Sequence, residues 1–183
     1  TPRAPMNTKI VRNEDPQILK RIDLFAKVLE AMASSGALDD DACKPAIGMI
    51  VRQASETSHW HDSSHYRSTP AAKLISAALK RGEIKTKAQY QKWCRSNLAH
   101  EHVVPVSVVM SMIRTLEQRT ERYIREILVE YSVRATITKE ENRNLVRPRS
   151  MPPCFTDKNH VHYNCPLSRY RESKFNEIAM VDL

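Results

Sequence analysis

The sequence predicts a mostly helical α+β protein, and two observations support this fold class. Apolar residues recur at helical spacing through much of the 183-residue chain. One short run, VRATIT at residues 133–138, alternates apolar and polar side chains as a half-buried strand does. The chain contains only three glycines, none of them in a GxGxxG or GxxxxGK[ST] motif, which excludes the glycine-rich phosphate-binding loops.

Four helices are predicted in the first half of the chain. The first begins at Asp15-Pro16, an N-cap followed by proline at the first helical position, and the turn residues 34–36 end it. Residues 56–69 are polar and aromatic and are expected to form a loop, whose histidines and aromatic rings either contact nucleic acid or pack against the body. The other three helices are expected over about residues 39–55, from Thr69-Pro70 to Gly82, and from Thr86 through Trp93.

A long amphipathic helix, over about residues 107–131, is predicted to open the second half of the chain. The strand at 133–138 follows it, and Thr138 and Glu141 then form a T-x-x-E capping box, so a short helix begins there. Residues 148–168 are rich in proline, asparagine and histidine and are expected to form a loop. The stretch SRYRESKF, from residue 168, is expected to form a last short helix or strand.

The charge of the chain indicates a polyanionic partner. The formal net charge is +8, an excess most often associated with nucleic acid, although charge spread over all faces for solubility is the alternative. No apolar run approaches the roughly 20 residues that a membrane span needs, and no signal peptide is recognised. Four cysteines without a CxxC pair indicate reduced thiols, so a cytoplasmic location is expected.

The polar residues with catalytic potential fall at the ends of the predicted elements. Glu101 and His102 lie at a strand end, and Asn142 lies in the first turn of the helix after the second strand. A β–β–α arrangement could bring all three to face one ion and one phosphate. Histidine titrates near neutral pH and suits a general base. A carboxylate such as Glu101 is a hard oxygen ligand that suits Mg²⁺ or Mn²⁺.

The stretch EHVVP at 101–105, followed by ITKEEN at 137–142, resembles the HNH, or His-Me finger, endonucleases. Met151-Pro152 and the Arg-Tyr-Arg run at 169–171 are similar to the tail of restriction-type and phage members, so the resemblance covers roughly residues 97–171. It implies a ββα-metal site, one divalent ion, Mg²⁺ or Mn²⁺, and cleavage of DNA. His102 and Asn142 are 40 residues apart because the helix at 107–131 is inserted. Residues 1–96 would form a helical region and 97–183 the HNH-like region of one compact unit.

The predicted site residues follow from this combination. His102 is the predicted base, and Glu101 and Asn142 are the predicted metal ligands. Arginines with few acids around them are predicted to contact DNA phosphates, namely Arg143, Arg147, Arg149, Arg169 and Arg171. Two alternatives remain open. One is a non-catalytic nucleic-acid-binding protein with a degenerate HNH-like site, and the other is a helical adaptor that binds a partner protein.

A second cluster raises the question of structural zinc. Cys154, His160, His162 and Cys165 follow the spacing C-x5-H-x-H-x2-C, which departs from the common zinc patterns. Loop residues with free thiols are the expectation, and a structural zinc ion is the alternative. His100 shares the strand face of His102 if the strand is regular, so it is expected to be a supporting or surface residue.

Overall fold

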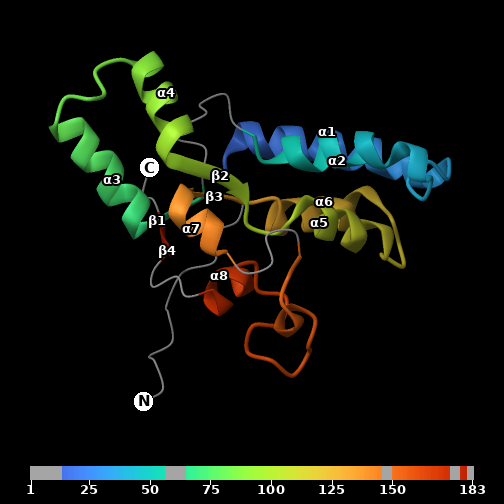
Figure 1. Cartoon of the computed structure of the whole chain (residues 1–183). Coiled ribbons are helices and arrows are strands. Elements are labelled where there is room, and N and C mark those ends of the chain that lie inside the picture. The colour runs from blue at the N-terminus through green and yellow to red at the C-terminus, as the bar shows by residue number, and fades with distance from the viewer. Residues whose placement is uncertain (1–13, 57–64, 146–149, 174–177, 181–183) are drawn as a thin grey trace.

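Helices surround a small central sheet in this protein (Figure 1). The computed structural model describes residues 14–56, 65–145, 150–173 and 178–180. The strands are β1 (Tyr66–Ser68), β2 (Leu98–His102), β3 (Arg134–Thr138) and β4 (Ile178–Met180). The helices are α1 (Pro16–Ser34), α2 (Lys44–Ala54), α3 (Thr69–Lys80), α4 (Lys87–Asn97), α5 (Val106–Arg114), α6 (Glu121–Tyr131), α7 (Lys139–Asn144) and α8 (Ser168–Glu172), with 3-10 turns η1 (Asp41–Cys43) and η2 (Pro153–Phe155). The predicted α+β, mostly helical class is confirmed.

The sheet has the strand order β2-β3-β1-β4. β2 is antiparallel to β3, β1 is parallel to β3, and β4 is antiparallel to β1. The strand β1 corrects the expectation that residues 56–69 form only a loop. It spans three residues, too few to show an alternating pattern, and its Tyr66 is fully buried beneath the sheet.

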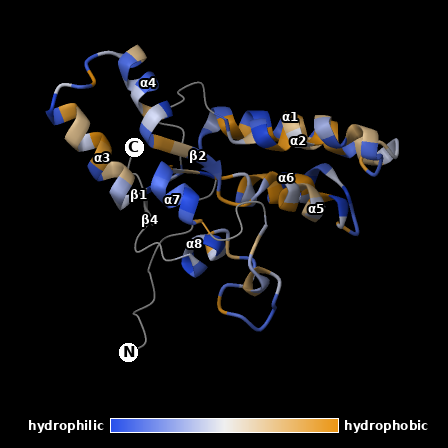
Figure 2. Cartoon of the chain, viewed as in Figure 1, coloured by the Kyte–Doolittle hydropathy of each residue, from blue (hydrophilic) through white to orange (hydrophobic). Residues whose placement is uncertain are grey.

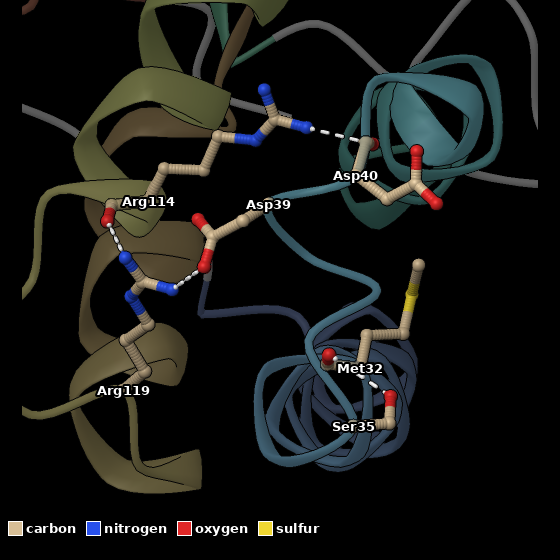
Figure 3. Close-up of polar contacts among 6 residues, drawn as sticks. All are labelled: Met32, Ser35, Asp39, Asp40, Arg114 and Arg119. Carbon is tan, nitrogen blue, oxygen red and sulfur yellow. Dashed lines mark hydrogen bonds and ion pairs between the residues drawn. The ribbon is translucent and has the colours of Figure 1, made fainter.

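Local capping signals set the ends of several helices where the sequence predicts them. Asp15 accepts hydrogen bonds from the backbone N–H groups of Gln17 and Ile18 and so begins α1. At the other end of α1, Ser35 donates to the carbonyl of Met32 (Figure 3), and Gly36 adopts a left-handed φ of 81°. Gly82 follows α3 in a left-handed conformation and Thr86 caps α4, as predicted. The cap of α3 is Ser68, so the predicted opening residue Thr69 is already inside the helix.

The prediction of a single long helix over residues 107–131 is wrong, because the chain forms two helices there, α5 and α6. Thr115 closes α5 by donating its hydroxyl to the carbonyls of Ser111 and Met112. In the connection, Arg119 donates to the Arg114 carbonyl at 2.6 Å and pairs with Asp39 in the turn after α1 (Figure 3). The two helices pack on each other and on α2 and α1, so both apolar faces enter the same core.

This helical core connects distant parts of the sequence. α1 packs along α6, and α2 packs along α5, as Figure 1 shows on one side of the sheet. In α1 the buried residues Ile18, Ile22, Ala26 and Leu29 form one face, as the helical spacing predicts. Residues 1–96 and 97–183 therefore share this core, and they also share the sheet, in which β1 lies between β3 and β4. Within the described residues, no helix is both long and apolar enough to cross a membrane.

Candidate functional site

The predicted strand end at Glu101-His102 is present as the end of β2. β2 and β3 pair along their full length, and His102 lies directly opposite Arg134. The backbone N–H of Val103 then donates to the carbonyl of Val133 at 3.0 Å, and Pro105 caps the start of α5. The strand β2 is at one edge of the sheet, so Glu101 and His102 lie on an edge strand.

Glu101 and His102 project to opposite faces of the sheet, because successive side chains alternate along a strand. Ala135 and Ile137 of β3 pack in one cluster with Leu145, at the C-cap of α7, and with Tyr170 of α8. Glu101 is paired with Ala135 and therefore shares this face, which α7 and α8 cover. His102 lies on the other face with His100, whose Nδ1 is 2.9 Å from the hydroxyl of Thr136.

Arg169 of α8 is the side chain that holds the end of β2. Its Nη2 donates to Glu101 Oε2 at 3.0 Å, to the His102 carbonyl at 2.7 Å and to the Val103 carbonyl at 3.2 Å. The side chain is only 1% exposed. This corrects the expectation that Arg169 offers its charge to DNA phosphate from the surface, since the guanidinium is buried and paired with a carboxylate of its own chain.

Only one of the two oxygens of the Glu101 carboxylate has a hydrogen-bond partner. Oε2 accepts from Arg169, while Oε1 is buried and has no hydrogen-bond partner. Burial raises the pKa of Glu101 to about 7, against the lowering effect of the Arg169 charge. A buried carboxylate oxygen without a partner costs free energy unless a cation, a proton or a water molecule satisfies it.

The imidazole of His102 lies in a strongly cationic environment. Its Nε2 is buried and has no hydrogen-bond partner. Burial, and then the charges of Arg134, Arg52 and Arg169, lower the pKa of His102 to about 4. His102 is therefore neutral at physiological pH, which is the form that can accept a proton.

Sequence reasoning missed the arginines beside His102, and it left open whether the histidines of residues 56–69, which include His65, pack against the body. His65 accepts a hydrogen bond at Nδ1 from the backbone N–H of Arg134, 3.1 Å away. The Arg134 guanidinium is 3.7 Å from Glu56, and its Nε is buried without a partner. The signal for Arg134 was present, since it is the first residue of the β3 strand that pairs with β2. Arg52, in the last turn of α2, had no local signal.

The helix α7 carries Asn142 and Arg143, and both side chains are exposed. Figure 2 shows α7 as hydrophilic along its length. The predicted capping box is confirmed, with Thr138 and Glu141 each bonded to the other's backbone. Thr138, the cap of α7, lies opposite Leu98 of β2. Leu98 is four residues before His102, so the start of α7 is about 13 Å from His102 along the strand. Since α7 covers the Glu101 face, Asn142 shares that side of the sheet with Glu101 and not with His102.

The other predicted contacts have separate locations. Arg147 and Arg149 lie outside the described residues. Arg171 is half-buried, and its Nη1 is 2.9 Å from Nδ1 of His162.

The four residues considered for zinc are all described. Cys154 and Cys165 are buried free thiols, and burial raises the pKa of Cys154 to about 11. Among the described residues, no group of three or more His, Cys, Asp or Glu side chains has the geometry to hold a metal ion.

A magnesium-type site is compatible with the donors at β2 and α7. Mg²⁺ is commonly held through one or two protein oxygens, with water and substrate phosphate completing its shell. The unpartnered Oε1 of Glu101 is a suitable oxygen. Asn142 shares its side of the sheet but is exposed on α7, which begins beside Leu98, three residues along β2 from Glu101.

Comparisons of the chain with protein-family models, with curated protein sequences and with solved structures found no match. What the protein does therefore has to be inferred from the chemistry of β2, β3 and α7.

Proposed function

We propose that the protein is a metal-dependent endonuclease that hydrolyses phosphodiester bonds in DNA, of the restriction or phage type. In this proposal His102 is the general base, and Glu101 and Asn142 bind one Mg²⁺ or Mn²⁺. The observation that carries it is the unpartnered, buried Nε2 of His102 at a strand end, opposite Arg134 and close to the charge of Arg52. The resemblance of EHVVP to the HNH endonucleases supports the same assignment.

The chemistry of phosphodiester hydrolysis suits this environment. The negative charge of the phosphodiester repels a nucleophile, so cations near the base both attract the substrate and offset that charge. Arg134 and Arg52 provide such cations beside His102, and the neutral imidazole can take the proton of the attacking water. A divalent ion held by Glu101 and Asn142 would supply further stabilisation of the charge that develops on the phosphate oxygens.

Affinity for DNA would come from the basic excess of the chain. Arg143 is exposed on α7 beside Asn142 and is a proposed phosphate contact, together with Arg147, Arg149 and Arg171. Binding through such contacts weakens steeply with salt, because each neutralised phosphate releases counterions. We propose Arg52, which is exposed in the last turn of α2, as a phosphate contact in place of Arg169, whose charge is committed to Glu101.

Two observations favour the alternative of a non-catalytic nucleic-acid-binding protein. Arg169 already neutralises one oxygen of Glu101, as it would in a site that no longer binds metal. Glu101 and His102 also face opposite sides of β2, so one ion and one attacking water would have to meet at the edge of the strand. Cleavage activity distinguishes the two functions directly.

The test is cleavage of supercoiled plasmid in Mg²⁺, Mn²⁺ or EDTA, read on a gel. We expect the parent protein to cut only with a divalent ion. His102→Ala and His102→Gln should each lose about 100-fold or more of the rate while keeping DNA affinity and the circular dichroism spectrum. His100→Gln is the control on the same sheet face and should keep most of the activity. A parent protein that binds DNA but never cuts it supports the non-catalytic alternative, and full activity of His102→Gln excludes His102 as the base.

A further inference from the structure

An open groove of about 410 Å³ is lined by α3, by the α3–α4 connection, by the start of α4 and by Arg67 of β1. Its polar lining is cationic, with Arg67 from β1 and with Lys85 and Lys87 at the start of α4. Among the described residues, no acidic side chain lines it. The nearby Glu83 is paired with Arg81 at 2.5 Å, so it does not offset these charges. The groove is therefore suited to an anionic ligand.

The rest of the lining is apolar and aromatic. Ile75 and Ile84 are almost completely buried and form part of the groove wall. Tyr90 is half-buried, packs against the cluster that contains Ile75, and also borders the groove. Leu79, also in the lining, is 52% exposed. A ligand that combines negative charge with a flat apolar surface would satisfy both parts of this lining, and a nucleotide has both.

The groove is connected to the candidate site through the sheet. Arg67 pairs with Thr136 of β3, and Thr136 contacts His100 of β2, so the three residues lie in one row across the sheet. Neighbouring strands are about 4.8 Å apart, which places Arg67 about 10 Å from β2. That distance corresponds to about three steps of a nucleic-acid strand at 3.4 Å per step.

We propose that this groove binds an unpaired nucleotide of the DNA strand that reaches His102, a few nucleotides from the bond that is cut. Lys85, Lys87 and Arg67 contact the backbone phosphates, and the base lies against Tyr90 and the apolar wall. This assignment rests on the proposed function for its substrate, but it concerns binding alone and needs no metal ion. It also gives the α3–α4 region, outside the resemblance to the HNH endonucleases, a role in holding the substrate.

The binding test uses a fluorescently labelled single-stranded DNA of 12 nucleotides, in EDTA, followed by fluorescence anisotropy across a salt series. The length is about that of one single-strand binding site. Lys85→Glu/Lys87→Glu should weaken binding about tenfold or more and reduce the salt slope by about 1.4, which is about 0.7 for each lost phosphate contact. Acidic residues in the first turn of α4 favour the helix, so the fold should be retained.

The matched control is Lys20→Glu/Lys27→Glu, which changes two exposed lysines of α1 and lowers the net charge from +8 to +4 as the test variant does. It should bind much more tightly than the groove variant. Tyr90→Leu keeps an apolar side chain in the cluster but removes the ring, and it should weaken binding about fivefold to tenfold.

The outcomes separate this proposal from the proposed function. If Lys85→Glu/Lys87→Glu and Lys20→Glu/Lys27→Glu bind the oligonucleotide equally, the groove is not the binding site, even if the protein cuts plasmid. Displacement of the DNA by polyglutamate at equal charge concentration overturns the nucleotide as the ligand, because an acidic peptide would then suffice. A parent protein that loses oligonucleotide binding on groove substitution but never cuts plasmid supports the groove and rejects the nuclease.

Discussion

Arg169 and Glu101 form a buried ion pair between residues 68 positions apart, with 3.0 Å between Arg169 Nη2 and Glu101 Oε2. The same nitrogen also reaches the carbonyls of His102 and Val103. One guanidinium from α8 thereby fixes both the Glu101 carboxylate and the backbone at the end of β2. The chain turns toward α5 directly after His102, the candidate base.

Removing this guanidinium should destabilise the fold strongly. Arg169→Met leaves a buried carboxylate without its cation and two carbonyls without their donor, so we expect the free energy of unfolding to fall by about 3 kcal/mol or more. Urea unfolding followed by circular dichroism measures the loss. Arg122→Met is the control, since Arg122 forms an exposed pair with Glu126 and should cost less than about 0.5 kcal/mol.

A second variant tests the cause of that loss. Arg169→Met/Glu101→Leu removes both charges, so part of the stability should return. If the double variant is less stable than Arg169→Met alone, the loss comes from packing around α8 and not from the uncompensated carboxylate.

The stability of the protein should fall as the solution becomes acidic, and His65 contributes to this. Burial, and then the charge of Arg134, lower the pKa of His65 to about 4, while Asp15 acts in the opposite direction. The unfolded chain, in which histidine titrates near 6.5, binds more protons between these values. The contribution of His65 to the free energy of unfolding is therefore complete above about pH 6.5 and is lost as the pH falls toward 4.

His65→Asn should reduce this pH dependence. The asparagine oxygen takes the position of Nδ1 and can still accept from the Arg134 N–H, but it cannot take a proton. We expect a smaller drop in Tm between pH 7 and pH 4.5 than in the parent, measured by thermal unfolding. The contribution of His102 to the stability of the fold is lost over the same pH range, and the contribution of Glu101, whose pKa is raised to about 7, changes in the opposite direction. Both are present in the parent and in the variant, so the difference between the two proteins isolates His65. An unchanged slope would contradict the assignment, and the exposed His160→Gln is the control.

The elements predicted correctly are those whose signals lie within a few residues. Asp15, Thr86 and Thr138 cap helices through bonds to backbone groups two or three residues ahead, so the sequence alone contains both partners. The break between α5 and α6 has one local contact, from the Thr115 hydroxyl to the carbonyls of Ser111 and Met112, but the apolar pattern in the sequence continues through it. The break is held by Arg119 and Asp39, which are 80 residues apart, and by the return of both apolar faces to one core.

The candidate site was predictable in its elements but not in its orientation. The sequence predicts β2, β3 and α7 in order, and the pleat of a strand already implies that Glu101 and His102 diverge. The burial of Arg169 could not be predicted, because nothing local distinguishes an arginine with a carboxylate 68 residues away from one on the surface. Arg52 was missed for the same reason, since it approaches His102 only through the fold.

The capping box of α7 gives a local test of the element that carries Asn142. The Thr138 hydroxyl accepts from the Glu141 N–H at 3.0 Å, and Glu141 Oε2 accepts from both the Thr138 N–H and the Ser68 hydroxyl at 2.7 Å. Thr138→Ala removes the first bond and should cost about 1 kcal/mol in urea unfolding. Thr138→Ser keeps the hydroxyl and should lie close to the parent. Equal losses in the two variants would mean that the methyl group, and not the cap, is responsible.

Glu101 should determine the affinity for metal if the proposed function is correct. Its Oε1 is the buried oxygen without a partner, and Asn142 lies on the same side of the sheet. Glu101→Gln removes the charge while its amide oxygen can still accept from Arg169, so the fold should be retained. We expect Mn²⁺ binding, measured by isothermal titration calorimetry without DNA, to weaken about tenfold or more, since even indirect partners of a metal contribute that much.

Two further variants and one activity measurement complete this prediction. Asn142→Ala should weaken Mn²⁺ binding less than Glu101→Gln, because a neutral amide contributes less charge to the ion than a carboxylate. Glu140→Gln removes an equal charge from an exposed position of α7 and is the control. In plasmid cleavage, Glu101→Gln should need more Mg²⁺, and excess Mg²⁺ should restore part of the rate. If Glu101→Gln binds Mn²⁺ as tightly as Glu140→Gln, the carboxylate is not a ligand, and its contact with Arg169 serves the fold alone.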